Sequence, residues 1–193
     1  MEPISGPALE ILLSLAIGLG LSAACGFRVF VPFLVMSVAA QAGYLDLAEG
    51  WDWIGSTPAL IAFTVAAILE VVAYYVPWLD NLLDTVATPA AIIAGVVATA
   101  SVVSGMSPFM TWTLAAIAGG GAAGIIQTGT VLLRGMSSAS TFGAGNFAVS
   151  TGEFAGSLFV SILAFLLPVF TLAAMLLFIV WIWRRLRRPR VIA

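Results

Sequence analysis

Residues 8–43 read ALEILLSLAIGLGLSAACGFRVFVPFLVMSVAAQAG, and this stretch decides the class of fold. It holds two apolar runs joined by residues 26–28. A helix that crosses the hydrocarbon core of a bilayer needs about 20 apolar residues, so the first run predicts a transmembrane helix over Ala8–Cys25. The second run, Val29–Gly43, is shorter and predicts a tilted or re-entrant helix.

The rest of the chain has the same apolar character. Of its 193 residues, 62% are hydrophobic and only 8% are charged, and the mean hydropathy is +1.14. A soluble domain carries about 25% charged residues, so most of this surface is expected to face lipid. The length fits one transmembrane domain over residues 1–193.

Further apolar runs bring the predicted bundle to seven helical segments, which makes the expected fold an all-α polytopic membrane bundle. The seven are Ala8–Cys25, Val29–Gly43, Pro58–Val76, Pro89–Ser104, Pro108–Leu133, Val149–Leu167 and Val169–Leu186. Between them, WLDNLLDTVA at 78–87 is too short and too polar to span, and predicts an amphipathic helix on the membrane surface. The Ser-, Gly- and Thr-rich stretch 135–146 predicts a loop.

The arginines fall on one side of this predicted bundle. Five of the seven lie between 184 and 190, directly after an apolar run, which is typical of a juxtamembrane anchor and not of a nucleic-acid-binding tail. Counting back through seven crossings puts Arg28 and Arg134 on the same side as this tail and the acidic loop 46–52 on the other. The positive-inside rule then predicts an outside N-terminus and a cytoplasmic C-terminus.

Two similar stretches suggest an internal repeat. PFLVMSVAA at 32–40 resembles PFMTWTLAA at 108–116, and the two run in opposite directions in the predicted topology. This predicts a 3+3 inverted repeat plus one helix, a recurrent plan in transporters. Shared composition of membrane helices is the alternative explanation. The parts would be a first repeat over 8–76, the linker helix 78–87, a second repeat over 89–167 and a final helix 169–186 with the basic tail.

Small residues recur at every fourth position on two segments. They are Ser14, Gly18, Ser22 and Gly26 in the first segment and Ala116, Gly120 and Gly124 in the fifth. This spacing lets helix backbones approach closely, so both segments are expected inside the bundle. The same faces would allow a homo-oligomer.

Few polar groups lie inside the predicted segments, and such groups in a bilayer are costly and often functional. The candidates for binding a solute or ion are Arg28, Phe30, Glu70, Gln127, Asn146, Ser150 and Glu153. Arg28 and Glu153 lie at two broken stretches, 26–32 and 143–153, where free N–H groups at a helix start attract anions. We expect Arg28 to pair with Glu153 or Glu70. The alternative is a buried ion pair that only fixes helix packing.

The block ACGFRVFVPFL at 24–34 resembles the signature of an uncharacterised bacterial integral-membrane family, a domain of unknown function. Other similar features are Glu70 with PWLDNLLD at 77–84, Thr88-Pro89, and Gly145-Asn146 with Ser150 and Glu153. The chain departs from the pattern at Phe147, where a proline is expected. The resemblance implies a multi-pass protein of the bacterial inner membrane and names no substrate.

The leading functional hypothesis is a small permease or channel for a small polar solute or ion, with an anion as one candidate. A second is a Mg²⁺-dependent lipid-modifying enzyme, because Asp80 and Asp84 lie one helical turn apart, although the two would equally solvate a surface helix. A third is a non-catalytic scaffold or lipid-binding subunit. No cofactor motif is visible, and a non-enzyme is favoured.

Overall fold

The structure is a computed structural model, and it describes residues 6–75, 77–168, 170, 171, 173, 174, 177, 180, 181 and 184; for residue 7 and residues 77–84 it describes the backbone alone. Every element in this part of the chain is helical. The elements are α1 (Pro7–Cys25), α2 (Phe30–Gln41), η1 (Asp52–Gly55), α3 (Thr57–Ala73), α4 (Pro77–Ala100), α5 (Pro108–Leu114), η2 (Ala115–Gly119), α6 (Gly120–Thr141) and α7 (Asn146–Leu166).

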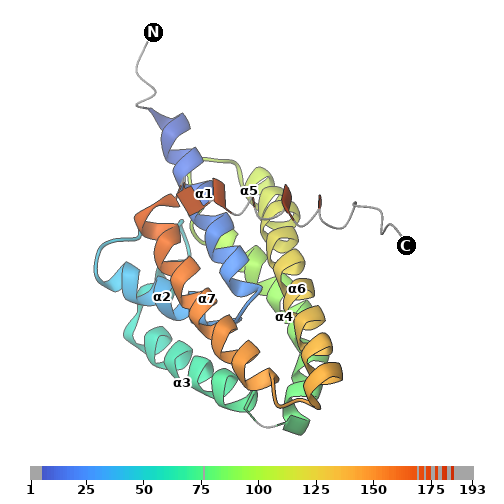
Figure 1. Ribbon diagram of the computed structural model, residues 1–193. Coiled ribbons are helices and arrows are strands. Elements are labelled where there is room, and N and C mark those ends of the chain that lie inside the picture. The colour runs from blue at the N-terminus through green and yellow to red at the C-terminus, as the bar shows by residue number, and fades with distance from the viewer. Residues whose placement is uncertain are drawn as a thin grey trace.

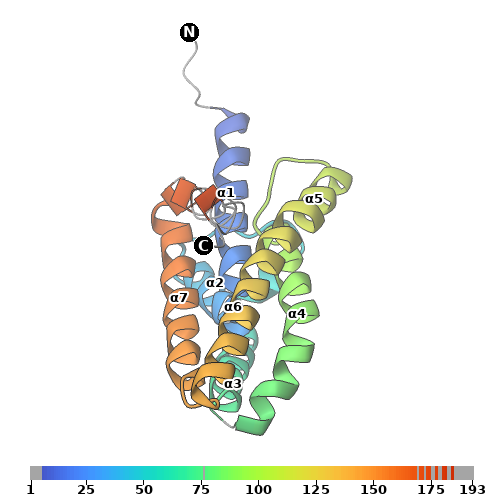
Figure 2. The same cartoon turned by 45° about the vertical axis from the view of Figure 1, so that its right-hand side comes forward.

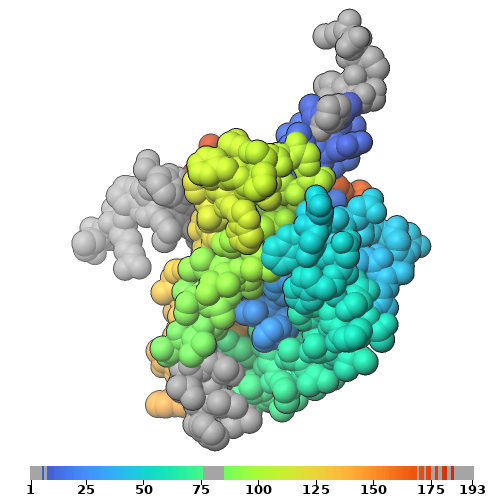
Figure 3. Space-filling view, turned by 180° about the vertical axis from the view of Figure 1, so that it is seen from behind, coloured from blue at the N-terminus to red at the C-terminus, as the bar shows by residue number. Residues whose placement is uncertain are grey.

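Helix α1 forms the centre of the bundle (Figures 1 and 2). Its neighbours are α4, α6 and α7, while the short α2 packs between α3 and α7. Helices α5, η2 and α6 follow one another without a break as a single rod of 34 residues, Pro108–Thr141. On the opposite side of the molecule from the view in Figure 1, α3 and α4 border a hollow (Figure 3).

Glycines bring the backbones of the central helices together, as expected from their spacing in α1 and α6. A Cβ atom added to Gly26 would lie 2.6 Å from the carbonyl oxygen of Ala123, and one added to Gly18 would lie 3.1 Å from Thr99. Gly95 of α4 is equally confined, since its Cβ would lie 2.6 Å from that of Ala123. Close approach of this kind is how apolar helices gain packing energy in a medium where the hydrophobic effect is weak.

A hydroxyl contact joins α1 to α4 in the same region. The Ser22 hydroxyl donates to the carbonyl oxygen of Gly95 and lies 2.8 Å from Thr99 Oγ1. Thr99 Oγ1 in turn donates to the carbonyl oxygen of Gly18 at 3.2 Å. We call this set the Ser22–Thr99 contact. All of its side-chain oxygens are buried and hydrogen-bonded, so it holds two helices in register without a charge.

Six helices occupy the described residues, when the continuous α5–α6 rod is counted once. Three of them are long and apolar enough to cross a membrane: α1, the α5–α6 rod and α7. The predicted second segment forms α2, which at 12 residues rises roughly 18 Å and is too short to span unaided. The predicted seventh segment, 169–186, and the basic tail lie outside the described residues except at scattered positions. The inverted repeat stays a prediction.

The predicted break before Pro89 is wrong. Helix α4 runs continuously from Pro77 to Ala100 with Pro89 in its interior, so the predicted linker helix and the predicted fourth segment are one element. A proline removes one backbone hydrogen bond, but helices in bundles tolerate the loss when neighbouring groups satisfy the freed carbonyl. The predicted amphipathic face of 78–87 falls largely on side chains outside the described set.

The predicted loop 135–146 is helical over its first half, and this is a second correction. Hydroxyl groups support the extra turns of α6, because Ser140 donates to the carbonyl oxygen of Met136 at 2.9 Å and Thr141 to that of Ser137 at 2.7 Å. The chain then turns at Phe142 and Gly143, both with positive φ (53° and 89°). Helix α7 begins at Asn146, three residues before the predicted start.

The α5–α6 rod contains one wider turn. The segment η2, Ala115–Gly119, is a π-helix that interrupts the α-helical hydrogen bonding. On the N-terminal side of the π-helix, Trp112 packs on Trp51, in the connection between α2 and α3, with ring centroids 6.3 Å apart. On the C-terminal side of the π-helix, Gly120 packs against Val96 of α4.

Candidate functional site

Polar side chains line the inner faces of α6 and α7. On α7 they follow each other at intervals of three or four residues, and on α6 the pattern is the same. The buried members are Ser150, Glu153, Ser157 and Ser161 on α7 and Gln127, Thr130 and Arg134 on α6. Such spacing places each set on one helical face, so the two faces form a polar layer inside an apolar bundle. Charge is present at one level of this layer.

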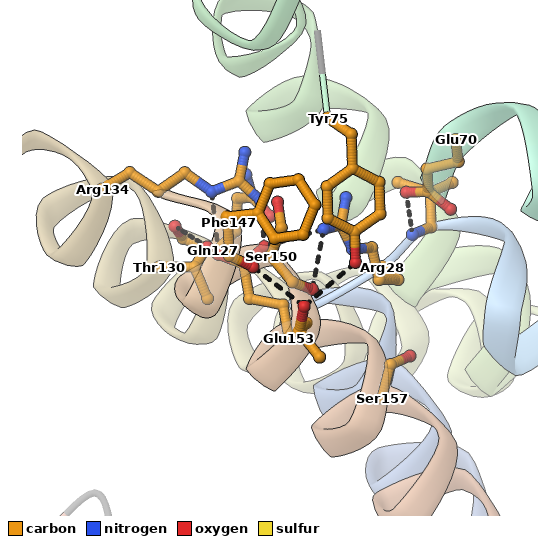
Figure 4. Close-up of polar contacts among 12 residues, drawn as sticks. Arg28, Glu70, Tyr75, Gln127, Thr130, Arg134, Phe147, Ser150, Glu153 and Ser157 are labelled. Atoms are coloured by element: carbon orange, nitrogen blue, oxygen red, sulfur yellow. Dashed lines mark hydrogen bonds and ion pairs between the residues drawn. The ribbon is translucent and has the colours of Figure 1, made fainter. Parts of the chain in front are cut away.

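Two arginines converge on Glu153 at that level (Figure 4). Arg28, from the connection between α1 and α2, places Nη2 3.3 Å from Oε2 of Glu153. Arg134 of α6 donates from Nε to Oε1 at 2.9 Å and from Nη2 to Oε2. Arg28 is 1% exposed, and Arg134 and Glu153 are each 4% exposed. We call these three residues the charged cluster. One of the two pairings predicted for Arg28 is therefore present.

Tyr74 supports both arginines. The guanidinium carbons of Arg28 and Arg134 each lie 3.9 Å from the centroid of its ring. The negative face of an aromatic ring attracts a cation, most strongly where water is excluded. Tyr74 is itself buried, at the end of α3, so the ring replaces part of the hydration that the two guanidinium groups lose.

The charged cluster has hydrogen-bond donors to spare. Arg28 Nη2 donates to the carbonyl oxygen of Ser150 at 3.1 Å. Its Nε and Nη1, and the hydroxyl of Ser150, have no hydrogen-bond partner among the described residues. Buried donors left in this state cost about 1–3 kcal/mol each, and more when they are charged. The arrangement suits a ligand that accepts hydrogen bonds.

Glu70, the other predicted partner of Arg28, binds backbone instead. Its Oε1 accepts from the N–H of Val29 at 2.8 Å, and its Oε2 accepts from the N–H of Phe30 at 3.0 Å. These groups form the start of α2, where a carboxylate is favoured by the helix dipole. Glu70 thus fixes the backbone next to Arg28, and the formal charge of the cluster itself stays at +1, from two arginines and one glutamate.

An aromatic contact lies beside the charged cluster at the ends of α3 and α7. The rings of Tyr75 and Phe147 have centroids 4.2 Å apart, and the Tyr75 hydroxyl lies 3.0 Å from Thr151 Oγ1. Phe147 precedes Ser150 by one turn of α7, so this contact adjoins the unpartnered atoms (Figure 4). It joins the residues just after α3 to the first turns of α7.

A family model described as a domain of unknown function (DUF4126) matches residues 15–188. The chain belongs to this family. The match includes every residue of the charged cluster and agrees with the expected uncharacterised family, but it assigns no activity. No curated protein and no solved structure matches the chain.

The remaining predicted site residues of this DUF4126 protein are more dispersed. Gln127 is buried on the polar face of α6. Phe30 is 38% exposed and lines a cavity together with Glu70. Asn146 donates from Nδ2 to Ser138 Oγ at 2.9 Å, which closes the turn between α6 and α7. Asp80 and Asp84 have side chains outside the described set, and among the residues that were described no group of three acidic, Cys or His side chains could hold a metal.

Sequence reasoning missed four members of the site: Arg134, Tyr74, Tyr75 and Thr130. Arg134 was expected at a helix end, because the fifth segment was predicted to finish at Leu133, but it lies two turns inside α6. Its spacing from Gln127 and Thr130 was the available signal, since positions 127, 130 and 134 share one helical face. The tyrosines indicated only a membrane interface, where aromatic residues are enriched, and nothing in the sequence placed them beside the arginines.

Proposed function

We propose that this protein is a small membrane permease or channel, that its solute is a small anion, and that the anion binds at Arg28. The observation that carries the proposal is the charged cluster: two buried arginines share one glutamate, and within the described part of the chain Arg28 keeps donors without a partner. Guanidinium N–H groups and a hydroxyl are the usual ligands of a small oxyanion or halide.

Energetics support a ligand at this position. A buried ion pair is often no more stable than an apolar replacement, and an excess buried charge is costly in a membrane. A cluster with two positive charges and one negative charge therefore needs a reason to persist. A bound anion would balance the charge and accept from Arg28 Nε and Nη1 and from Ser150 Oγ, which have no hydrogen-bond partner among the described residues.

The surroundings of the cluster support a membrane setting. Large apolar side chains of α3 are at least half exposed, as expected for a face against lipid; they include Ile61, Val65 and Ile68. The acidic loop precedes the start of α3 and the charged cluster lies at its end, roughly 25 Å away for a helix of 17 residues. With the positive-inside rule, this separation supports a cytoplasmic cluster and an acidic loop outside, and in the seven-crossing topology it gives an outside N-terminus.

The Tyr75–Phe147 contact is the gate in this proposal. The two rings and the Tyr75–Thr151 hydrogen bond close the cytoplasmic approach to Arg28. On the other side, Ser157 and Ser161 extend the polar face of α7, but both are fully buried. The conformation is thus a closed one, and transport requires the contact between α3 and α7 to part.

The test is anion flux in liposomes that contain the purified full-length protein. Chloride, nitrate, formate and phosphate are each loaded inside, and efflux is followed with ion-selective electrodes. We expect efflux of at least one anion, and Arg28→Gln should slow it about tenfold or more, because a charged hydrogen-bond donor is lost. Thr128→Ala, on the exposed face of α6, is the control and should transport as the wild type does. If wild-type liposomes pass none of the four anions, or Arg28→Gln passes them equally well, the proposal fails.

The two other hypotheses gain no comparable observation. The Mg²⁺-dependent enzyme rests on Asp80 and Asp84, whose side chains lie outside the described set. The scaffold hypothesis predicts a stable partner and no flux. Anion flux in the liposome experiment would therefore contradict it, and an absence of flux would favour it.

A further inference from the structure

A cavity of about 470 Å³ lies between α2, α3 and α4, and the described residues that line it include no arginine. In Figure 3 it is the hollow between the teal α3 and the green α4, with blue atoms at its floor. Its volume is in the range of ordinary ligand pockets, about 300–1,000 Å³. Neither the family nor the proposed transport function assigns it a role.

The walls of this cavity are apolar and open sideways. Leu69, Val86 and Phe30 line it and are 62%, 59% and 38% exposed, so they form its rim. Leu69 continues into the exposed apolar face of α3, which includes Ile68 and Val72. A hydrocarbon chain that covers this face can therefore enter the cavity without leaving an apolar medium. A water-soluble ligand would have to cross that apolar medium to reach the cavity.

The polar end of the cavity is acidic. Glu70 is the single charged side chain among the described residues that line it, and Tyr74 is its other strongly polar group. Each Glu70 oxygen accepts one backbone hydrogen bond, and a carboxylate oxygen has room for a second. Glu70 belongs to the last turn of α3, which ends at Ala73, and so lies at the depth where lipid head groups meet the helix ends.

We propose that this cavity binds phosphatidylethanolamine, with one acyl chain against Leu69, Ala87 and Ala90 and the primary ammonium on Glu70. The charge decides the head group. An ammonium brings a positive charge and three N–H donors to the carboxylate. A choline group brings the charge without N–H donors, and an anionic glycerol head group is repelled. The Tyr74 ring separates this lipid from the arginines, so the site does not depend on anion transport.

Native mass spectrometry of the full-length protein tests the head group. The protein is released from detergent after titration with ethanolamine, choline, glycerol and N-acetyl-ethanolamine phospholipids that share the same acyl chains. We expect the ethanolamine lipid to be retained about tenfold more than each of the others, since N-acetylation removes the charge and two donors without altering the tails. Equal retention of the ethanolamine and N-acetyl lipids overturns the proposal with no variant needed.

Two variants test the location. Glu70→Gln keeps an acceptor for the backbone but loses the charge, and should retain the ethanolamine lipid no better than the choline lipid. Ala90→Phe fills the cavity and should lower retention of the ethanolamine lipid about tenfold, while Val65→Phe, on the outer face of α3, should leave it unchanged. If Glu70→Gln does not fold, Ala90→Phe decides alone. Unchanged retention in Ala90→Phe would place the lipid at another site and overturn the proposal. A dimer that carries no lipid would make a second copy of the chain the occupant and would overturn it too.

Discussion

The Ser22–Thr99 contact and the charged cluster are both buried polar sets that involve the central helix or its end, but they differ in completeness. In the first, the side-chain oxygens are neutral and every one is hydrogen-bonded. In the second, two arginines share Glu153, and Arg28 keeps two nitrogen atoms without a partner in the described structure. A satisfied neutral set explains helix packing fully. An unsatisfied charged set is explained by a ligand that completes its hydrogen bonds. Of the two sets, we therefore assign function to the charged cluster.

The strongest way to break the comparison is to remove the carboxylate. Glu153→Gln leaves Arg28 and Arg134 buried without a counter-charge, and we expect a loss of about 3–5 kcal/mol in the free energy of unfolding. Cys25 is the one cysteine of the sequence and is buried, so a thiol-reactive fluorophore reports unfolding on heating. Glu49→Gln, on the exposed loop, is the control and should melt like the wild type. Equal melting of both variants would mean that the cluster is not held by its charges.

A second change tests the packing region. Gly95→Ala places a Cβ 2.6 Å from that of Ala123 and 2.9 Å from the carbonyl oxygen of Gly119, so α4 must shift away from α6. Overpacking of this kind costs about 1–3 kcal/mol, measured in the same thiol assay. The matched control is Gly121→Ala, where a Cβ meets nothing within 4 Å. It should be as stable as the wild type or more stable, because alanine is the better helix former.

A pair of serine substitutions sharpens the comparison directly. Ser22→Ala removes a bonded hydroxyl and should cost about 1 kcal/mol in stability, with anion flux unchanged. Ser150→Ala removes an unpartnered hydroxyl and should leave stability unchanged but slow flux about threefold to tenfold, because the anion loses one donor. Thermal unfolding and liposome efflux on both variants give four values. The opposite pattern would reverse our assignment of the two regions.

The smallest expected effect concerns the gate. Tyr75→Phe removes the hydrogen bond to Thr151 but keeps the ring on Phe147, so stability should fall by less than about 1 kcal/mol, while anion efflux rises. Thr151→Val should act in the same way. The double variant should be no faster than either single one, because both break the same bond. Additive rates would show that the contact does not gate the cluster.

Much of the fold follows from apolar length alone. α1 and α7 were predicted because an uninterrupted apolar run in this composition has few alternatives to a helix. The errors came where local chemistry opposes the usual rules. Pro89 does not stop α4, and the Ser- and Thr-rich end of α6 stays helical because its hydroxyl groups bond back to their own helix. Sequence composition does not reveal either kind of compensation.

Two of the three charges in the candidate site, Arg28 and Glu153, were predictable, whereas Arg134 and the aromatic residues were not. Arg28 and Glu153 were selected because an ionised side chain in an apolar segment is rare and expensive. Their meeting is a tertiary event that brings together residues 125 positions apart in the sequence, and no local pattern encodes the ring of Tyr74 against both arginines. Glu70 is unusual for the same reason, but its hydrogen bonds to the start of α2 depend on how α3 crosses that helix.

The π turn at Ala115–Gly119 has a consequence for how this chain tolerates insertions and deletions. A π turn holds one residue more than an α turn, and each residue of an α-helix turns its neighbours by about 100°. Deleting one residue here would restore a regular α-helix without rotating either half, because the wider turn absorbs the extra residue within one turn. Trp112 would still lie on the side of Trp51, and Gly120 would still face α4. The π turn is thus a place where this helix can gain or lose one residue while both halves keep their contacts.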